Sequence, residues 1–286
     1  MARVRQSTMG SFTKCAYQMH HQLSGKYGYR SGIARGLGTA IHAGLEVHYR
    51  ERKNGEPLSN VDVYVDAVVA SLDAEVDKSE SFNWTFQQQT MRKDELILDR
   101  ESSIVMLDEL IRLYFSEGWG YPDDYEILEV EISFDLPLPS GKHMAHGTGD
   151  LLIRDPRGRL ILADHKTSKD FPTRSRWGPN DSPQAPYYTW AVSQLFDTPI
   201  EDIGFFYDVL AWAPRRPGRG NELNPKDRFA RFEETCTRQQ VESVVSQANI
   251  IGDLVDAEAF APDTTGWWCS KNFCDFWQEC QFGAGR

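Results

Sequence analysis

The sequence lacks any apolar run long enough to cross a bilayer. A membrane-spanning helix needs about 20 consecutive apolar residues, and no segment of this 286-residue chain approaches that length. Residues 1–8 also lack the apolar core that a secretory signal peptide requires. We therefore expect neither a membrane protein nor a secreted protein, and we predict a cytoplasmic location.

The sequence also has fewer basic than acidic residues. The chain has 31 Lys and Arg residues against 42 Asp and Glu residues, which gives a formal net charge of -11. This balance excludes a protein coated in positive charge. Any nucleic acid would therefore have to bind in a local basic groove.

Internal repeats and low-complexity segments are also absent. The composition, with 40% hydrophobic and 26% charged residues, is typical of a globular chain. A chain of this length can bury a sizeable core, either as one large domain or as two small ones. We expect a single domain that covers residues 1–286.

Cysteines are few, and their placement is uneven. Five of them, an odd number in a chain without an export signal, indicate a reducing compartment, where clustered thiols bind metal more often than they form disulfides. Cys236 stands alone and is expected to be a small buried residue. The other four lie near the two ends of the chain, at Cys15, Cys269, Cys274 and Cys280.

Hydrophobic periodicity predicts helices in the first part of the chain. Apolar residues recur at helical spacing from Leu37 to His48. Asn60 is placed to cap a second helix, and a third helix is predicted over residues 91–115. Residues 1–120 are therefore expected to form a helical region.

The period then changes to two, which is typical of strands. Residues 146–154 and 160–167 flank a proline-glycine turn and predict a hairpin. Further predicted elements are a helix over 182–195, strands over 203–212 and 228–234, and a helix capped at Thr237. An earlier strand is predicted over 125–134, with one buried face made of Leu128, Val130, Ile132 and Phe134.

The turn of the hairpin decides which residues face each other. Pairing Asp155 with Gly158 places Asp150 opposite Ala163 and diagonal to Asp164. Diagonal neighbours on paired strands are still within reach of each other's side chains. The two carboxylates are therefore predicted to approach one another.

A lysine is predicted to join the two carboxylates. Asp164 and Lys166 are two positions apart and share one face of the strand, whereas His165 points away. Adjacent carboxylates are unfavourable unless a divalent cation compensates them, and oxygen ligands favour magnesium or manganese. With a lysine that holds a phosphate or orients water, these groups supply the parts of phosphodiester hydrolysis. The alternative is a solvent-facing strand on which Asp164 and Lys166 form a weak surface pair.

This arrangement resembles the core of the PD-(D/E)XK nucleases. Gly149-Asp150 is followed, fourteen positions after the aspartate, by Asp164-His165-Lys166. More narrowly, the chain resembles the RecB-like branch, which includes CRISPR-associated and phage-encoded exonucleases.

Two further segments strengthen the resemblance. His42, in a Gly-Thr-Ala-Ile-His helix, resembles the metal-binding histidine of the family, and Gln184-Ala-Pro-Tyr-Tyr188 resembles its Gln-x-x-x-Tyr motif. Taken alone, His42 is compatible with an ordinary helix histidine that has Glu46 as a local partner. Gln184 and Tyr188 are likewise compatible with ordinary positions on an amphipathic helix.

The resemblance implies an α/β fold in which helices flank a central mixed sheet. It divides the chain into a helical region over residues 1–120, a nuclease core over 121–260 and a cysteine-rich tail over 261–286. The metal ligands that it implies are His42, Asp150, Asp164 and the backbone carbonyl of His165.

The family also implies roles for the remaining residues of the site. Lys166 would position or activate the attacking water, while Gln184 and Tyr188 would support the site and contact nucleic acid. Asp164 departs from the commoner glutamate of the motif, although aspartate is an accepted alternative. Glu129 and Glu131 are compatible with assisting a second metal or with simply facing water.

The cysteines resemble the iron-sulfur pattern of the same family. The resemblance implies that four of them ligate a 4Fe-4S cluster that joins the tail to the N-terminal region, and four thiolates would also suit a structural zinc. The last three cysteines are separated by four and then five residues, whereas the family usually has two and then five. The implied ligands are Cys15, Cys269, Cys274 and Cys280.

We therefore expect a metal-dependent DNA exonuclease that acts on linear ends or single strands in recombination, repair or phage DNA processing. The alternatives are an endonuclease and a non-catalytic DNA-binding subunit, which would work with a partner protein in a recombination or CRISPR-adaptation complex. Trp177, Tyr187 and Tyr188 are available to stack on bases. Basic residues available to contact phosphates are Arg157, Arg159, Lys169, Arg174, Arg176, Arg215, Arg216 and Arg219.

Overall fold

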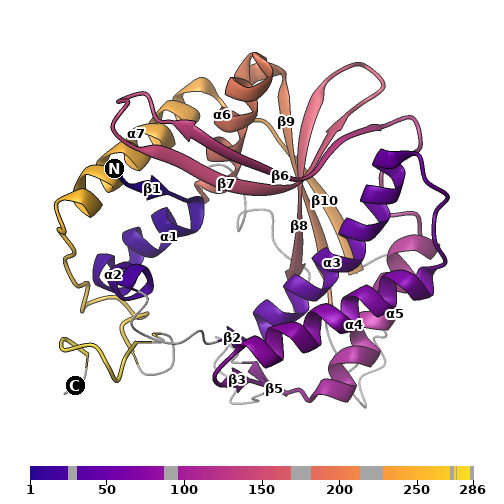
Figure 1. Cartoon of the computed structure of the whole chain (residues 1–286), viewed down its shortest axis with the longest axis horizontal. Coiled ribbons are helices and arrows are strands. Elements are labelled where there is room, and N and C mark those ends of the chain that lie inside the picture. The colour runs from indigo at the N-terminus through magenta and orange to yellow at the C-terminus, as the bar shows by residue number, and fades with distance from the viewer. Residues whose placement is uncertain are drawn as a thin grey trace.

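The structure, a computed structural model of the whole chain, describes residues 1–24, 31–86, 96–168, 182–212, 228–270, 274 and 276–283. Within these ranges a six-stranded mixed sheet separates two groups of helices (Figure 1). The predicted α/β class, with a central mixed sheet flanked by helices, is confirmed. No helix in the described ranges is both long enough and apolar enough to span a membrane.

The strand β7 lies at the centre of the pairing. One of its edges pairs with β6, and the other pairs with β8 at one end and with the short β1 at the other. The parallel pair β8 and β9 and the antiparallel pair β9 and β10 complete the sheet. The strands are β1 (Arg3–Val4), β6 (Glu126–Pro137), β7 (Met144–Arg154), β8 (Leu160–Ser168), β9 (Ile203–Ala211) and β10 (Phe229–Glu234).

Helices cover both faces of this sheet (Figure 1). One face carries α3 (Ile33–Asn54), α4 (Val61–Lys78) and α5 (Arg100–Ser116), and the other carries α6 (Gln184–Phe196) and α7 (Arg238–Asp256). The chain begins with α1 (Gln6–Lys14) and α2 (Ala16–Ser24). Short elements are β2 (Ser31–Gly32), β3 (Phe82–Asn83), β4 (Thr85–Phe86), β5 (Leu96–Ile97) and the 3-10 turn Ile200–Asp202.

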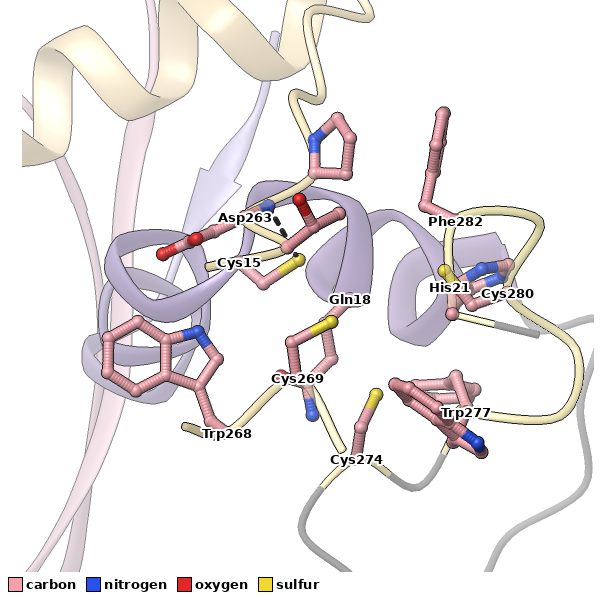
Figure 2. A pocket seen from close by; sticks show the side chains of 14 residues that line it. Cys15, Gln18, His21, Asp263, Trp268, Cys269, Cys274, Trp277, Cys280 and Phe282 are labelled. Carbon is pink, nitrogen blue, oxygen red and sulfur yellow. Dashed lines mark hydrogen bonds between the residues drawn. The ribbon is translucent and has the colours of Figure 1, made fainter. Parts of the chain in front are cut away.

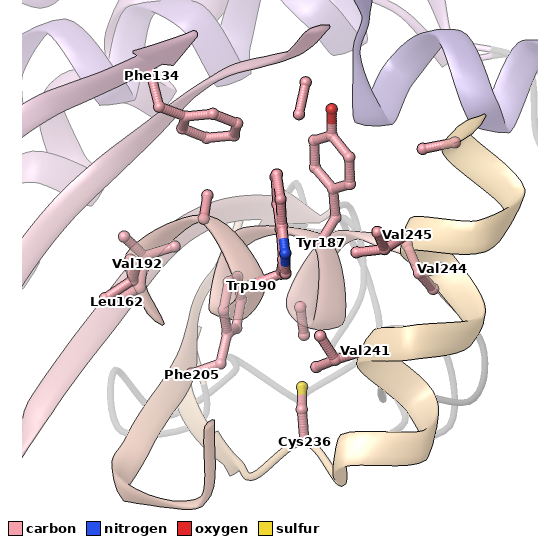
Figure 3. Close-up of a cluster of buried hydrophobic side chains, with 14 of the residues drawn as sticks. Phe134, Leu162, Tyr187, Trp190, Val192, Phe205, Cys236, Val241, Val244 and Val245 are labelled. Carbon is pink, nitrogen blue, oxygen red and sulfur yellow. The ribbon is translucent and has the colours of Figure 1, made fainter. Parts of the chain in front are cut away.

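Alternate residues of β8 point into two separate hydrophobic cores. Leu162 joins the core under α6 and α7, whereas Ile161 joins the core under α3, α4 and α5. β9 is buried at every position because helices cover both of its faces. Figure 3 shows the first core, in which Trp190 of α6 lies near the valines of α7. Cys236 is buried in this core, as predicted.

Two of the helices begin at the caps that the sequence predicts. The Asn60 side chain accepts from the backbone N–H of Asp62, and Thr237 forms the expected capping box. The third helix is shorter than predicted, because Asp99 caps it and α5 begins only at Arg100. The predicted start of that helix, at residue 91, lies outside the described residues.

The prediction that β6 buries a single face is wrong. Val130 lies in the core under α3, whereas Ile132 lies in the core under α6. The strand changes face between them because Glu131 adopts a left-handed backbone conformation, with φ of 55°. A second irregularity lies between Ile127 and Glu129, where the register against β7 shifts.

The predicted register of the hairpin is wrong by one residue. Asp155 pairs with Arg159 and not with Gly158, since the Asp155 N–H donates to the Arg159 carbonyl at 3.0 Å. The turn therefore contains three residues, and Gly158 occupies a left-handed conformation with φ of 86°. Continued by one position beyond its last pair, Leu151 and Ala163, this register would set Asp150 against Asp164 in place of the predicted Ala163.

A glycine allows α3 to approach α4 closely. A Cβ atom on Gly44 would lie 2.6 Å from Val68 Cγ2 and 3.0 Å from the Tyr64 carbonyl oxygen. We expect Gly44→Ala to destabilise the protein by about 1–3 kcal/mol in urea unfolding, because the clash outweighs the better helix propensity of alanine.

The matched control is Gly10→Ala in α1, where a Cβ atom would meet nothing within 4 Å. This change should be neutral or should stabilise the protein by up to about 1 kcal/mol. Equal effects of the two substitutions would contradict the close packing of α3 against α4.

Candidate active site at a fork in the sheet

The site lies where β7 and β8 stop pairing. Their register runs from Arg154 opposite Leu160 to Leu151 opposite Ala163. Beyond that pair, β7 continues beside β6 while β8 continues beside β9. The two strands diverge in Figure 1. Asp150 and Asp164 are the first residues beyond the last pair, Leu151 and Ala163, and so stand at the fork.

Side chains replace the backbone partners that the fork removes. The His165 N–H donates to Asp150 Oδ2 at 2.7 Å, and the His165 carbonyl accepts from His42 Nε2 at 2.6 Å. The other ring nitrogen of His42 lies 3.5 Å from Asp150 Oδ1. The fork thus joins the predicted ligands His42, Asp150 and His165 in one hydrogen-bonded group.

Asp164 is held from two sides. Its Oδ1 accepts from Gln184 Nε2 at 2.6 Å, and its Oδ2 lies 2.5 Å from Lys166 Nζ. Burial raises the pKa of the Asp164 carboxyl group, Lys166 opposes this rise, and the nearby Asp150 adds to it. Asp164 is only 5% exposed, so it is not the solvent-facing residue of the alternative interpretation.

The helix α6 braces both arms of the fork. Gln184 reaches Asp164 on β8, and the Tyr188 hydroxyl donates to the Thr148 carbonyl on β7 at 2.9 Å. Because the two residues are one helical turn apart, they share a face of the helix. Burial raises the pKa of Tyr188, so its hydroxyl stays protonated and able to donate.

Glu131 adds a further carboxylate beside the site. The pairs that flank it on β6 place it opposite Asp150. Burial raises the pKa of Glu131 from its ordinary value of 4.5 to about 7, and the charges of Asp150 and Glu46 add to the rise. Glu129, by contrast, pairs with Lys53 at 2.6 Å. Sequence periodicity did not separate the two glutamates, because the left-handed backbone conformation of Glu131 has no clear sequence signal.

The fork contains groups that could bind a cation, but they are not arranged as a preformed metal site. Among the described residues, no three His, Cys, Asp or Glu side chains are gathered as a ready metal site. Asp164 is instead occupied by Lys166 and Gln184, and Asp150 by the His165 amide. The carboxylate and carbonyl oxygens here are nevertheless the type of ligand that magnesium and manganese prefer.

The four outer cysteines lie at the other end of the molecule, where, among the described residues, no three of them are gathered closely enough to form a ready metal site. All of them line one pocket between α1, α2 and the tail, and Figure 2 shows them around a shared space. The Asp263 N–H donates to Cys15 Sγ at 3.5 Å. Ring contacts join Tyr17 to Phe282, with centroids 5.0 Å apart, and so attach the tail to α2.

The basic residues expected to contact phosphates lie either at the turn of the hairpin or outside the described residues. Arg157 and Arg159 line a pocket at the turn of the hairpin, away from the fork. The other candidates lie outside the described residues, namely Lys169, Arg174, Arg176, Trp177, Arg215, Arg216 and Arg219.

A mixed sheet between helices thus carries two aspartates and a lysine at its fork. The family model of the PD-(D/E)XK nuclease superfamily matches residues 4–281. The chain therefore belongs to the PD-(D/E)XK nuclease superfamily.

Two of the solved structures that resemble this chain are distant from it in sequence. A "putative exonuclease" from Eubacterium rectale is 12% identical, with a TM-score of 0.49, and the match covers 93% of this chain and 86% of that one. The protein SSO0001 is 15% identical, with a TM-score of 0.33, and the match covers 93% of each chain. A search of curated proteins found no significant match.

The raised pKa of Glu131 predicts how the stability of the metal-free protein depends on pH. The Glu131 carboxyl group binds its proton more tightly in the folded state than in the unfolded state. The free energy of unfolding should therefore fall as the pH rises from 4.5 to about 7. Glu131→Gln removes this loss. With chelator at pH 8, we expect it to be about 1–2 kcal/mol more stable than the wild type, after allowing for solvent screening.

Urea unfolding at pH 5 and pH 8 would measure this effect, with Glu129→Gln as the matched control. The control should show no such gain, because Glu129 is paired with Lys53 at the surface. A stability difference for Glu131→Gln that does not grow with pH would contradict the prediction.

Proposed function

We propose that this protein is a metal-dependent DNA exonuclease and that residues 1–286 form one nuclease domain. The main support is the fork between β7 and β8, which brings Asp150, Asp164 and Lys166 together in a member of a nuclease superfamily. The RecB-like resemblance favours linear ends or single strands as substrates. It also favours a role in recombination, repair or phage DNA processing.

The proposed cofactor of the site is Mg²⁺ or Mn²⁺. The neighbouring carboxylates of Glu131, Asp150 and Asp164 support this, because like charges placed together are unfavourable until a cation compensates them. A bound cation supplies positive charge against the charge that develops on the scissile phosphate. The residues that would hold it are His42, Asp150, Asp164 and the carbonyl of His165.

Lys166 is placed to act on the phosphate or on the attacking water. Its side chain is 26% exposed, and its ammonium group is held by Asp164. Gln184 holds the other carboxylate oxygen of Asp164, so the lysine has a fixed anchor. From this position it donates to a phosphate oxygen or orients water for in-line attack.

The second proposed cofactor is a 4Fe-4S cluster bound by Cys15, Cys269, Cys274 and Cys280, with structural zinc as the alternative. Four thiols that line one pocket have the chemistry that either group requires.

Lys166→Ala should reduce cleavage by at least about 100-fold, the loss expected when a group that stabilises the transition state is removed. The assay uses end-labelled single- and double-stranded linear DNA and a closed circle, each with magnesium, manganese or chelator. We expect metal-dependent loss of the linear DNA while the circle stays intact.

Lys142→Ala is the matched control, since Lys142 pairs with Asp253 at the surface, away from the fork. Cutting of the circle would indicate an endonuclease. DNA binding without any cleavage by the wild type would indicate a binding subunit, and full activity of Lys166→Ala would refute the proposed role of the lysine.

The cysteine proposal predicts a visible sulfur-to-iron absorbance in anaerobically purified protein. Cys269→Ser should lose most of it, whereas Cys236→Ala should keep it because Cys236 lies in the core under α6 and α7. A colourless wild type that contains one zinc per chain would replace the cluster with the zinc alternative. A wild type with neither metal would contradict both.

A further inference from the structure

A row of buried polar side chains crosses the sheet behind the fork. The register pairs His165 of β8 with Asp208 of β9, and Asp208 with Arg231 of β10. Asp208 is fully buried, and His165 is 3% exposed. Polar groups in such a place cost free energy unless partners replace the water they lose.

Arg231 provides such partners for Asp208. Its Nε and Nη2 lie 2.6 Å and 2.8 Å from the two carboxylate oxygens, so the pair is bidentate. The same guanidinium group donates to the Trp119 carbonyl at 3.1 Å and lies over the Tyr121 ring, 3.9 Å from its centroid. Asp208 is therefore fixed in position.

The imidazole ring of His165 lies between two carboxylates. Its Nδ1 is 3.8 Å from Asp150 Oδ2, and its Nε2 is 4.0 Å from Asp208 Oδ2. Among the described residues, Nε2 is buried without a hydrogen-bond partner. The ring also stacks on Tyr49 of α3, with centroids 5.9 Å apart and planes at 26°. The Tyr49 ring and the two carboxylates therefore surround the imidazole ring on three sides.

The backbone of this same residue faces the site. The His165 amide holds Asp150, and the His165 carbonyl accepts from His42. The ring and these two peptide groups share one Cα atom. A ring that is held in place therefore limits how far either peptide group can rotate.

We infer that Asp208 and Arg231 act through the His165 ring as positioning residues for the metal site. They fix the His165 amide against Asp150 and aim the His165 carbonyl into the fork. Residues that orient the ligands of a metal typically change its affinity by about 10–100-fold when they are mutated. The inference rests on the proposed function, because it requires that the fork bind a divalent cation.

The test measures Mn²⁺ binding by the full chain, from the electron paramagnetic resonance signal of the free ion. His165→Phe keeps a ring against Tyr49 but removes both ring nitrogens. We expect its Mn²⁺ dissociation constant to rise by about 10-fold or more, while circular dichroism shows a folded protein.

His48→Phe is the matched control. His48 is also a buried histidine of the α3 face and also contacts Tyr49, with ring centroids 5.0 Å apart. It makes no described contact with the ligands at the fork, so its Mn²⁺ affinity should stay within about twofold of the wild type.

If His165→Phe does not fold, Arg231→Lys replaces it in the Mn²⁺-binding measurement. It keeps the positive charge beside Asp208 but loses the bidentate geometry, and it should weaken Mn²⁺ binding by about threefold or more. If folded His165→Phe binds Mn²⁺ as tightly as the wild type, this inference is overturned while the proposed function stands. The same holds for Arg231→Lys where it replaces His165→Phe in the test. A wild type that neither binds Mn²⁺ nor cleaves DNA would overturn the proposed function, and this inference with it.

Discussion

Two strands that stop pairing must satisfy their exposed backbone groups by other means, and this constraint shapes the site. After Leu151 and Ala163, the groups of β8 that would have faced β7 lose their ladder partners. The Asp150 carboxylate takes the His165 amide, and His42 takes the His165 carbonyl. The contacts that make the fork tolerable in the fold are therefore the contacts that assemble the acidic and basic groups of the nuclease.

The remaining parts of the molecule hold the fork open. The helix α6 contacts both arms, through Gln184 on β8 and Tyr188 on β7. Helices on both faces keep water away from β9, which supplies the rigid parallel neighbour that β8 needs beyond the fork. Burial, together with the charges of Asp150 and Glu46, raises the pKa of Glu131, so ionising this carboxyl group costs stability at the site. A bound cation would relieve that cost.

The N-terminal segment links the cysteine pocket to the strand that carries Asp150. The strand β1 pairs with β7 and is followed by α1, which ends beside Cys15. The Tyr187 hydroxyl of α6 donates to the Val4 carbonyl at 2.6 Å and secures the same segment. A metal group in the pocket would thus stabilise a segment that packs on the nuclease sheet, at a distance from the chemistry.

The sequence by itself determined the element types and the helix caps at Asn60 and Thr237, because periodicity and capping are local properties. Motif spacing and the family resemblance supplied the candidate residues for the site. Tertiary structure decided the rest. The three-residue turn set the register that brings Asp150 and Asp164 to the fork, and the left-handed Glu131 changed the face of β6. The row from His165 to Arg231 arises only when three strands align side by side. Such pairings join residues far apart in the chain, and spacing along one strand carries no information about them.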